Sequence, residues 1–427
     1  MASTATSTAA SQSSSSVILD WAHAQGVVAP DIDIQTSIVC ANDALVVDNG
    51  VFTKSVSSGG HLYFGIPESL LITRKSVSKY LPTAHIAVLL SIPSVDMDAS
   101  YEFENALILL FFLAESSKRK LSPWFPYFNA APNVFHLTPN YTEDELLELH
   151  STPLYKATLM RTEELLQTYN KLFPHLIVAY PDIFPEAWCT WEKFLWAVGM
   201  LDSRTFKIRI DGILQVVAIP LVDMLNHSFT NSLGNASFNH ESRRVQLIST
   251  RNSNKGDELT ITYGPHSNAE LLLFYGFAIN DNPYDTLELV MEAPEEDPAV
   301  SLLKMSLLAS FGLATNLTFL LQKGAIPMQL LPSLRILLMD EVDLAEIALH
   351  PLVHVNNPIS TVNEDCVLAT FDVVLDSLQE QHHTTIQDDD ILLQDETLPC
   401  RIRNVVIYRR EQKKIIEWTK QWLAAQQ

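Results

Sequence analysis

The chain has 427 residues, of which 47% are hydrophobic and 18% charged, a composition that supports a large core spread over two or three domains. Its 28 Lys and Arg against 50 Asp and Glu give a formal net charge of −22. This balance argues against a general nucleic-acid binder, which needs a basic face to neutralise phosphates. It suits a protein that attracts a basic partner surface.

The cysteines and the hydropathy of the chain narrow the class of protein further. The four cysteines form no CxxC pair, so we expect no metal site and no disulfide framework, and a cytoplasmic or nuclear location. The longest apolar run, residues 106–114, is far shorter than the roughly 20 residues of a membrane span, so we expect a buried helix and no membrane partner. Residues 1–16 are uncharged and rich in Ser, Thr and Ala, which predicts a disordered tail.

Short apolar pieces separated by turns predict strands in the first 70 residues. The predicted strands are 38–40, 44–47, 51–52 and 61–64. The predicted turns are 42–43, 48–50 and 58–60. Many short strands with little helix between them indicate a β-rich fold rather than a doubly wound sheet.

Residues from about 98 to 180 have the pattern of helices. Thr142 and Glu145 form a capping-box pattern, in which each side chain bonds the backbone amide of the other residue. Thr152-Pro153 predicts a second helix start, with proline at the first helical position.

Strand patterns return between residues 207 and 262. The predicted strands are 208–210, 214–217, 245–248 and 259–262. Asp211-Gly212 is typical of the two-residue turn of a hairpin and joins the first two of these strands.

After Asn282-Pro283 the chain is predicted to be mostly helical to its end. Asp297 is expected to cap a helix that Gly312 ends, with one apolar face formed by Val300, Leu303, Leu307 and Phe311. Residues 388–390 are expected to be a solvated acidic helix start. A last helix, 401–423, is expected to carry four basic residues on exposed positions: Arg409, Arg410, Lys413 and Lys414.

Two segments carry the residues that are best suited to binding or catalysis. Asp223-Met224-Leu225-Asn226-His227-Ser228 follows an apolar strand, and Gly256 to Gly264 contains a strand that ends at Tyr263. Asn226 and His227 could bind a polar ligand, or form a polar turn with a surface histidine. Tyr263 could place a phenol at a reacting centre, or be a core aromatic at a strand end. Asp223 is better explained as a structural cap than as a catalytic group.

Two further segments have both a functional and a structural interpretation. Arg204, in Ser203-Arg204-Thr205-Phe206, could bind a carboxylate as a bidentate fork, or pair with a helix end at the surface. Tyr275 and Phe277 follow a helix that Gly276 ends, and they could line a channel or pack at the helix end.

The order and spacing of these segments resemble the SET-domain methyltransferases of the Rubisco large-subunit lysine methyltransferase type. The resemblance covers nearly the whole chain after residue 17. The matching segments are 50–52, 65–71, 124–128, 143–146, 203–206, 223–228, 256–264, 267–277 and 282–285.

The resemblance implies an α+β fold. A β-rich SET domain, 17–280, would have pseudoknot-like threading and a helical insert at about 98–200, an exception to the rule of unthreaded chains. An all-α C-terminal domain, 281–427, would hold the protein substrate.

The resemblance also implies an enzyme that transfers a methyl group from S-adenosylmethionine to a lysine amine of another protein. Tyr263 would be the catalytic residue. The cofactor would be bound by Val47, Asp48, Asn49 and Gly50, mostly through backbone, and by Arg204, Asn226, His227 and Tyr275. The substrate would be bound by Phe206, Val222, Asp223, Tyr275 and Phe277.

The chemistry explains why such a site is apolar and holds a phenol. An in-line methyl transfer needs a neutral amine held near the methyl group. A free lysine has a pKa of about 10.4, so only on the order of one in a thousand is neutral near pH 7.4. A dry aromatic channel lowers that pKa, and the Tyr263 hydroxyl would orient the amine and accept a weak contact from the methyl.

Two features of the sequence leave other functions open besides lysine methylation. Many relatives carry Gly-x-Gly where this chain has Asp48-Asn49-Gly50, which motivates a catalytically silent SET-fold protein that binds partners. A related branch that methylates actin histidine carries Asn and Trp near the acceptor pocket. This chain has Phe206 and Val222 there, which favours lysine and leaves a histidine acceptor as the alternative.

Overall fold

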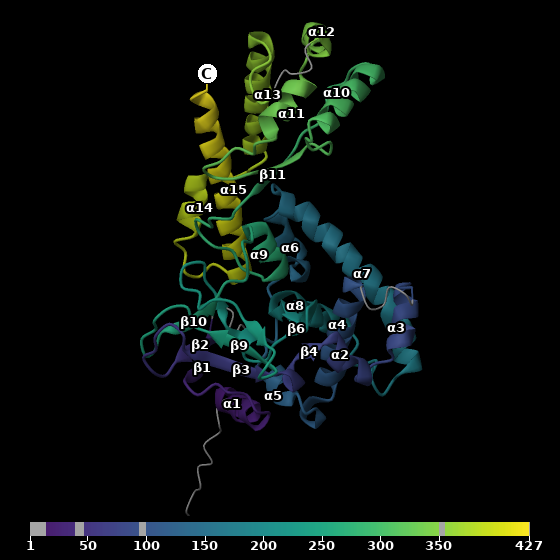
Figure 1. Ribbon diagram of the computed structural model, residues 1–427, viewed down its shortest axis with the longest axis vertical. Coiled ribbons are helices and arrows are strands. Elements are labelled where there is room, and N and C mark those ends of the chain that lie inside the picture. Colours follow the sequence, from purple (N-terminus) through teal and green to yellow (C-terminus); the bar gives the residue numbers. More distant parts are fainter. Residues whose placement is uncertain (1–13, 39–46, 94–99, 350–354, 427) are drawn as a thin grey trace, which may run out of the picture. The chain divides into compact units, whose positions relative to one another are not determined.

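The computed structural model describes residues 14–38, 47–93, 100–349 and 355–426. Contacts divide the chain into two compact units, which are described separately below. The first unit is Met1–Asn140 with Met160–Pro265, and the second is Tyr141–Leu159 with His266–Gln427. The elements of the chain are drawn in Figure 1.

The first unit contains three small sheets. The strand orders are β1-β2-β10-β7, β3-β9-β8 and β4-β6-β5. The strands are β1 (Ile32–Ile38), β2 (Val47–Thr53), β3 (Leu62–Pro67), β4 (Ile72–Thr73), β5 (Thr205–Ile210), β6 (Ile213–Ala218), β7 (Asn226–His227), β8 (Ser237–Asn239), β9 (Arg244–Ile248) and β10 (Glu258–Ile261).

The prediction of a turn at residues 48–50 is wrong, because these residues lie within β2. That strand pairs antiparallel with β1 along its whole length, with Gln35 opposite Gly50 and Thr36 opposite Asn49. The backbone hydrogen bonds to β1 outweigh the preference of residues 48–50 for a turn. The strand predicted at 38–40 lies outside the described residues beyond Ile38, and the turn 42–43 and residues 44–46 lie outside them as well.

The later strands agree with the sequence pattern. Antiparallel β5 and β6 are joined at Asp211-Gly212, where both residues have positive φ, 49° and 84°. Positive φ at both positions is the conformation that a tight hairpin turn requires, so the predicted hairpin is confirmed.

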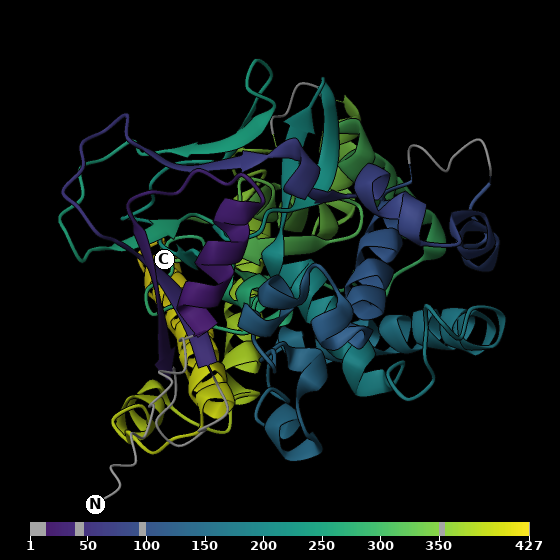
Figure 2. The same cartoon turned by 90° about the horizontal axis from the view of Figure 1, so that it is seen from below.

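The helices of the first unit pack against one another and against the strands. Residues Leu107 to Glu115 of α4 are all buried, which confirms the buried helix predicted there, and α4 packs against α8. Helix α1 lies against α5 and β1, as the purple helix in Figure 2 shows. The helices are α1 (Ser14–Ala24), α2 (Arg74–Val77), α3 (Thr83–Leu90), α4 (Tyr101–Ser117), α5 (Phe125–Ala130) and α8 (Trp191–Arg204).

The first compact unit does not coincide with the predicted SET domain, 17–280. Helix α1 begins at Ser14, within the stretch expected to be disordered, and residues 1–13 lie outside the described part. Residues 141–159 and 266–280 belong to the second unit. The reason is a shared apolar cluster that joins Tyr141, Leu149, Leu154 and Leu272 to Val405 and Tyr408.

In its described residues the second unit is mostly helical and has one antiparallel ribbon, β11 (Leu287–Val290) with β12 (Thr318–Leu321), a departure from the all-α domain expected at 281–427. The capping box of Thr142 and Glu145 is present, with both reciprocal hydrogen bonds. The helices are α6 (Glu143–Leu147), α9 (Asn268–Phe274), α10 (Pro298–Ser310), α11 (Leu330–Leu337), α12 (Glu341–Leu349), α13 (Thr361–Glu380), α14 (Ile386–Leu392) and α15 (Cys400–Ala424), while α7 (Pro153–Ala179) spans both units.

Helix α10 has the predicted ends but a different buried face. Asp297 caps its first turn and Gly312 follows it with φ 68°. Leu303, predicted to face inward, is 48% exposed, whereas Lys304 and Leu308 are buried. The Lys304 ammonium pairs with Glu296 at 2.6 Å and donates to the Leu337 carbonyl at 2.9 Å. This ion pair allows a lysine to occupy the inner face.

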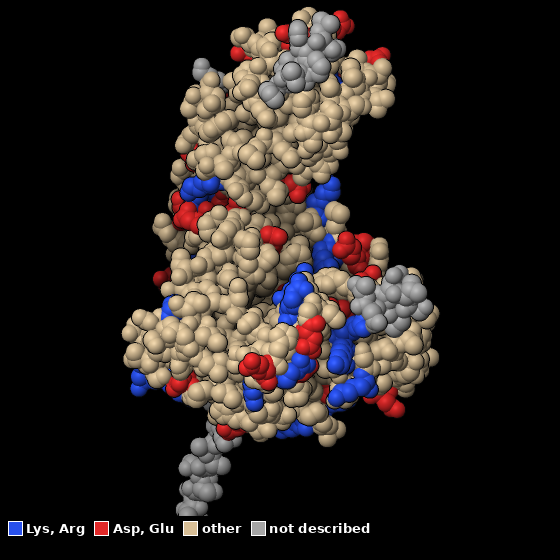
Figure 3. Space-filling model, viewed as in Figure 1, with Lys and Arg blue, Asp and Glu red and all other residues tan. Residues whose placement is uncertain are grey.

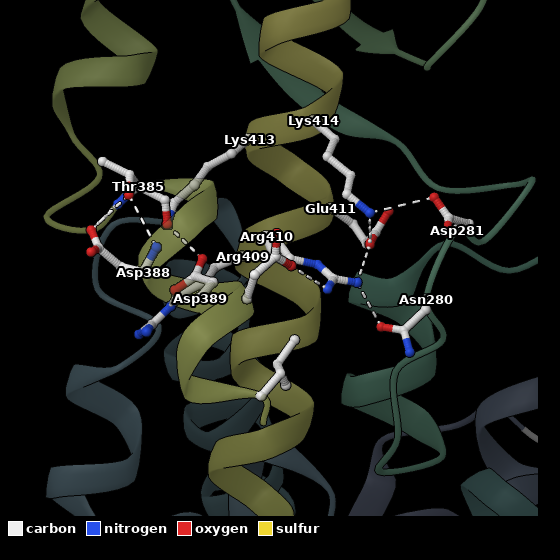
Figure 4. A network of polar contacts seen from close by, with 12 residues as sticks. Asn280, Asp281, Thr385, Asp388, Asp389, Arg409, Arg410, Glu411, Lys413 and Lys414 are labelled. Carbon is white, nitrogen blue, oxygen red and sulfur yellow. Dashed lines mark hydrogen bonds and ion pairs between the residues drawn. The ribbon is translucent and has the colours of Figure 1, made fainter. Parts of the chain in front are cut away.

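Helix α15 also buries charges that the sequence places at the surface. Arg409 and Lys413 are each 7% exposed, and both bind the fully buried Asp389 of α14, at 2.9 Å and 2.7 Å (Figure 4). The predictions of exposed basic positions and of a solvated acidic cluster are therefore wrong for these three residues, and Arg410 and Lys414 are half-buried rather than exposed. A charge can be buried when an opposite charge and hydrogen bonds accompany it.

None of the helices that the structure describes combines the length and the apolar character needed to cross a membrane. Within the same residues, no group of three or more His, Cys, Asp or Glu side chains could hold a metal ion.

Candidate active site

The two segments singled out in the sequence lie side by side in the first unit. Strand β7 pairs parallel with β10, so that Asn226 lies opposite Thr260 and His227 opposite Ile261. The Ser228 amide extends this pairing by donating to the Ile261 carbonyl at 2.9 Å. Because β10 continues directly into Tyr263, the pairing brings Tyr263 to the Asn-His segment.

Tyr263 is held at both its backbone and its side chain. Its amide donates to Nδ1 of His227 at 3.0 Å, and its hydroxyl donates to the Leu225 carbonyl at 2.8 Å. The two rings lie 5.1 Å apart. Because Nδ1 accepts a hydrogen bond, the neutral His227 ring carries its proton on Nε2. A phenol that donates to a carbonyl acts as an acceptor toward another group, which is the role predicted for Tyr263.

A strained turn delivers Leu225 to this position. Leu221 has a φ of 73°, which is rare for a residue with a side chain, and the 3-10 helix Val222–Met224 follows it. Residues Leu221 to Leu225 are all buried, whereas Asn226, His227 and Tyr263 are half-buried. The groups that could meet a ligand therefore stand on a rigid, enclosed support.

Asp223 is at the centre of that support. Its side chain is completely buried, and its Oδ2 accepts a 2.7 Å hydrogen bond from the Tyr127 hydroxyl. Burial raises the pKa of Asp223 to about 6, against the opposing effects of the Arg204 charge and the Tyr127 hydrogen bond. This geometry agrees with the structural role favoured from the sequence.

Arg204 is buried rather than exposed, so the interpretation as a surface arginine is wrong. Its Nη1 donates to the Asp223 carbonyl at 2.8 Å and lies 4.0 Å from the Asp223 carboxylate. The guanidinium thus supports the turn from the end of α8. A contact of Arg204 with a cofactor carboxylate stays a prediction.

Gly50 and Asn226 meet the same glutamate. The Asn226 amide donates to Oε1 of Glu258 at 2.7 Å. A Cβ added to Gly50 would lie 3.2 Å from that oxygen and 2.8 Å from the Phe52 ring. A side chain at position 50 would therefore force its neighbours to move, which explains glycine there without any positive φ.

The remaining positions of the predicted cofactor loop are strand residues. Asn49 is 9% exposed, and its amide donates to the Ala130 carbonyl at 2.6 Å, which ties β2 to α5. Val47 and Asp48 pair with Ile38 and Ser37 through the backbone. Asp48, which stands where relatives carry the first glycine, lies within β2, so its backbone is extended and does not need the conformational freedom of glycine.

The predicted substrate residues lie in both units. Phe206 is half-buried on β5, and Val222 is completely buried in the core beneath the turn. Tyr275 and Phe277 belong to the second unit, where their rings lie 6.4 Å apart and Tyr275 is 5.5 Å from His266. The binding roles of these four residues, and that of Asp223, stay predictions.

Sequence reasoning missed two residues of the site. Glu258 lies within the motif that contains Tyr263, so its acidic side chain at the start of the strand was a readable signal. Tyr127 lies 96 residues before Asp223, and nothing local marks it as a partner of the motif. Only the folded chain brings the two together.

The chain belongs to the SET-domain family. The SET domain matches residues 48–264, just over half of the chain, and the Rubisco LSMT substrate-binding domain matches residues 294–416. These matches confirm the resemblance inferred from the sequence.

The curated relatives include actin-histidine N-methyltransferases. Those of Dasypus novemcinctus and Mus musculus are each 27% identical, over 376 and 372 residues, and the alignments cover 83% of this chain. They cover 61% and 60% of the relatives, so the chain spans about three fifths of the length of the proteins it matches.

Solved structures establish the fold. Rubisco LSMT bound to sinefungin and monomethyllysine has a TM-score of 0.77 at 24% identity, over 98% of this chain and 92% of its own. Rubisco LSMT bound to AdoMet has a TM-score of 0.76 at 24% identity, over 97% and 92%. The α+β SET fold with a helical C-terminal region is therefore confirmed.

Proposed function

We propose that this chain is an S-adenosylmethionine-dependent protein N-methyltransferase. One observation carries the proposal: the hydroxyl of Tyr263 is fixed by the Leu225 carbonyl beside the paired Asn226-His227 segment. Family membership and the names of the relatives support the same activity.

The residues present fit the cofactor. The half-buried Asn226 and His227 offer polar groups beside Tyr263. Gly50 leaves a backbone face next to Glu258 where a Cβ would crowd its neighbours. These residues would hold S-adenosylmethionine, which supplies an electrophilic methyl group when it is bound.

This chain's own residues would orient the acceptor and exclude water. The Tyr263 oxygen would accept a hydrogen bond from the incoming nitrogen, because its own proton is donated to Leu225. The carbonyls of the turn are held by buried contacts, so the site does not need to reorganise during the reaction. The acceptor nitrogen must arrive neutral, because its lone pair would take the methyl group as the bond from that methyl to sulfur breaks, and the methylated nitrogen would then release a proton to solvent.

We infer a lysine acceptor from the apolar residues at the two positions, Phe206 and Val222, of which the half-buried Phe206 can face an acceptor while Val222 is completely buried behind the surface. An apolar lining lowers the pKa of a lysine amine by desolvation and offers no partner for an imidazole N–H. A histidine acceptor is the second candidate, and the names of the curated relatives favour it.

A partner protein with a basic face suits the charge of the second unit. This unit carries 11 Lys and Arg against 28 Asp and Glu, whereas the first unit carries 17 against 22. Helices α12 and α13 contain eight Asp and Glu and no Lys or Arg, and the part of the face in Figure 3 that holds them shows scattered acidic side chains and almost no basic ones. Charge complementarity of this kind raises the rate of encounter with a basic protein.

The first experiment mixes the purified chain with a cell extract and isotopically labelled S-adenosylmethionine, and maps labelled residues by mass spectrometry. Label on lysine supports the leading proposal, and label on histidine supports the second candidate. The pH dependence gives an independent check, because lysine methylation should rise steeply from pH 7 to 9. Histidine, with a pKa of about 6.5, should be methylated at a nearly constant rate there.

Tyr263→Phe should lower the transfer rate by about 100-fold or more, since it removes one preorganised hydroxyl from the reacting centre. Cofactor affinity, measured by calorimetry, should stay within about threefold of the parent value. Tyr169→Phe is the matched control, because that hydroxyl donates to the Cys189 carbonyl at 2.8 Å. An unchanged rate in Tyr263→Phe would defeat the mechanism.

A catalytically silent SET-fold protein is the competing proposal. Calorimetry without detectable S-adenosylmethionine binding would favour it over an enzyme. A cytoplasmic or nuclear location also remains a proposal, which imaging of the tagged full chain would test.

A further inference from the structure

Tyr127 is a fully buried residue of α5, and core packing explains its ring but not its hydroxyl. Its ring lies 5.2 Å from Phe128 and 6.4 Å from Trp124, as a core aromatic would. Its hydroxyl, however, is directed at Asp223 and donates to Oδ2 at 2.7 Å. A hydrogen bond to a buried carboxylate is roughly twice as strong as one between neutral groups.

Two helices thus hold one residue of the turn. Tyr127 of α5 binds the Asp223 side chain, and Arg204 of α8 binds the Asp223 carbonyl at 2.8 Å. Burial, followed by the charge of Asp223, raises the pKa of Tyr127 well above its ordinary value, so the phenol stays a proton donor. These two contacts fix Asp223 in both its backbone and its side chain.

The turn that they fix bears directly on the active site. Leu221 keeps its φ of 73° two residues before Asp223, and strain of this kind persists only where the surroundings enforce it. Two residues after Asp223, the Leu225 carbonyl receives the Tyr263 hydroxyl at 2.8 Å. A shift at Asp223 would therefore move the acceptor that aims the catalytic phenol.

We propose that Tyr127 is a positioning residue for methyl transfer, which acts through Asp223 to hold the turn that aims Tyr263. The inference rests on the proposed function for its kinetic consequence. It predicts a loss in rate with little change in cofactor binding, because Tyr127 binds Asp223 and not Asn226 or His227, the residues expected to hold the cofactor.

Tyr127→Phe is a clean test because it removes one hydroxyl and keeps the ring. The initial rate of label transfer from S-adenosylmethionine to protein in a cell extract should fall about 10- to 100-fold, the range expected for a misplacement of about 1 Å. The cofactor Kd, measured by calorimetry, should stay within about threefold. Tyr63→Phe is the matched control, since Tyr63 is fully buried and its hydroxyl bonds Ser57.

A double-mutant cycle identifies the route. If Tyr127 acts through Asp223, adding Tyr127→Phe to Asp223→Asn should reduce the rate by a smaller factor than it does in the parent, because the charged acceptor is gone. Equal factors in both backgrounds would overturn the inference.

Hydrogen exchange supplies a readout that does not need activity. Amides of residues 221–225 should exchange faster in Tyr127→Phe and in Asp223→Asn than in the parent, and at the parent rate in Tyr63→Phe. Unchanged exchange in Tyr127→Phe would overturn the inference even in an inactive protein. Absence of transfer by the parent chain would instead defeat the proposed function.

Discussion

At the scale of single residues, several groups of the site have backbone carbonyls as partners. Tyr263 binds the Leu225 carbonyl, Arg204 binds the Asp223 carbonyl, and Asn49 binds the Ala130 carbonyl. Such contacts fix the path of the chain more than they fix other side chains. The motif residues can therefore be read in the sequence, while the groups that hold them cannot.

Asp223 gives a prediction about stability and pH. Its pKa is about 6 in the folded chain and about 3.9 when unfolded, so the folded state binds more protons between these values. The free energy of unfolding contributed by Asp223 therefore falls as pH rises from about 4 to about 6. Asp223→Asn should remove this fall, which is on the order of 1 kcal/mol per pKa unit.

Thermal unfolding of both proteins at pH 5.0 and pH 7.5 measures the difference. The unfolding temperature of Asp223→Asn minus that of the parent should be higher at pH 7.5 than at pH 5.0. Asp285, whose pKa burial also raises to about 6, contributes equally to both proteins and cancels. Parallel pH dependence in the two proteins would contradict the prediction.

At the scale of elements, the clearest departures from the sequence pattern involve buried charge. Helix α10 places Lys304 inside and leaves Leu302 71% exposed, because Glu296 and the Leu337 carbonyl receive the ammonium. Helix α15 buries Arg409 and Lys413 against Asp389 of α14 (Figure 4). A periodicity argument assigns charges to the surface and misses pairs formed by distant residues.

Removing Asp389 should destabilise the second unit. Asp389→Ala leaves Arg409 and Lys413 buried without their shared carboxylate, which should cost about 3 kcal/mol. Glu148 and Thr384 remain as their other partners and limit the loss. Denaturant unfolding measures the change.

Asp390→Ala is the control at the next position of α14. Asp390 pairs with Arg410 at 2.8 Å, and its side chain is 51% exposed, so its loss should change stability by less than about 1 kcal/mol. Equal effects at 389 and 390 would show that burial of the pair does not matter.

At the scale of the whole molecule, the uneven charge predicts a dependence on salt. The second unit has 28 acidic against 11 basic residues, so a basic substrate should be attracted over several ångströms. Raising the ionic strength from 0.05 to 0.5 M should therefore increase the KM for a basic protein substrate several-fold, by screening. The cofactor Kd, measured in the same buffers, should change less. A KM that is independent of salt would contradict a basic partner.

The sequence determined the family, the order of the secondary structure and the motif residues. Hairpins, capping boxes and the strand before Tyr263 depend on neighbouring residues, and their signals are therefore local. The tertiary structure alone decided that residues 48–50 form a strand and that Tyr127 binds Asp223. It also decided that Asp389 holds two buried cations. Each of these depends on a partner distant in sequence, and hydrogen bonds of that kind leave no local pattern.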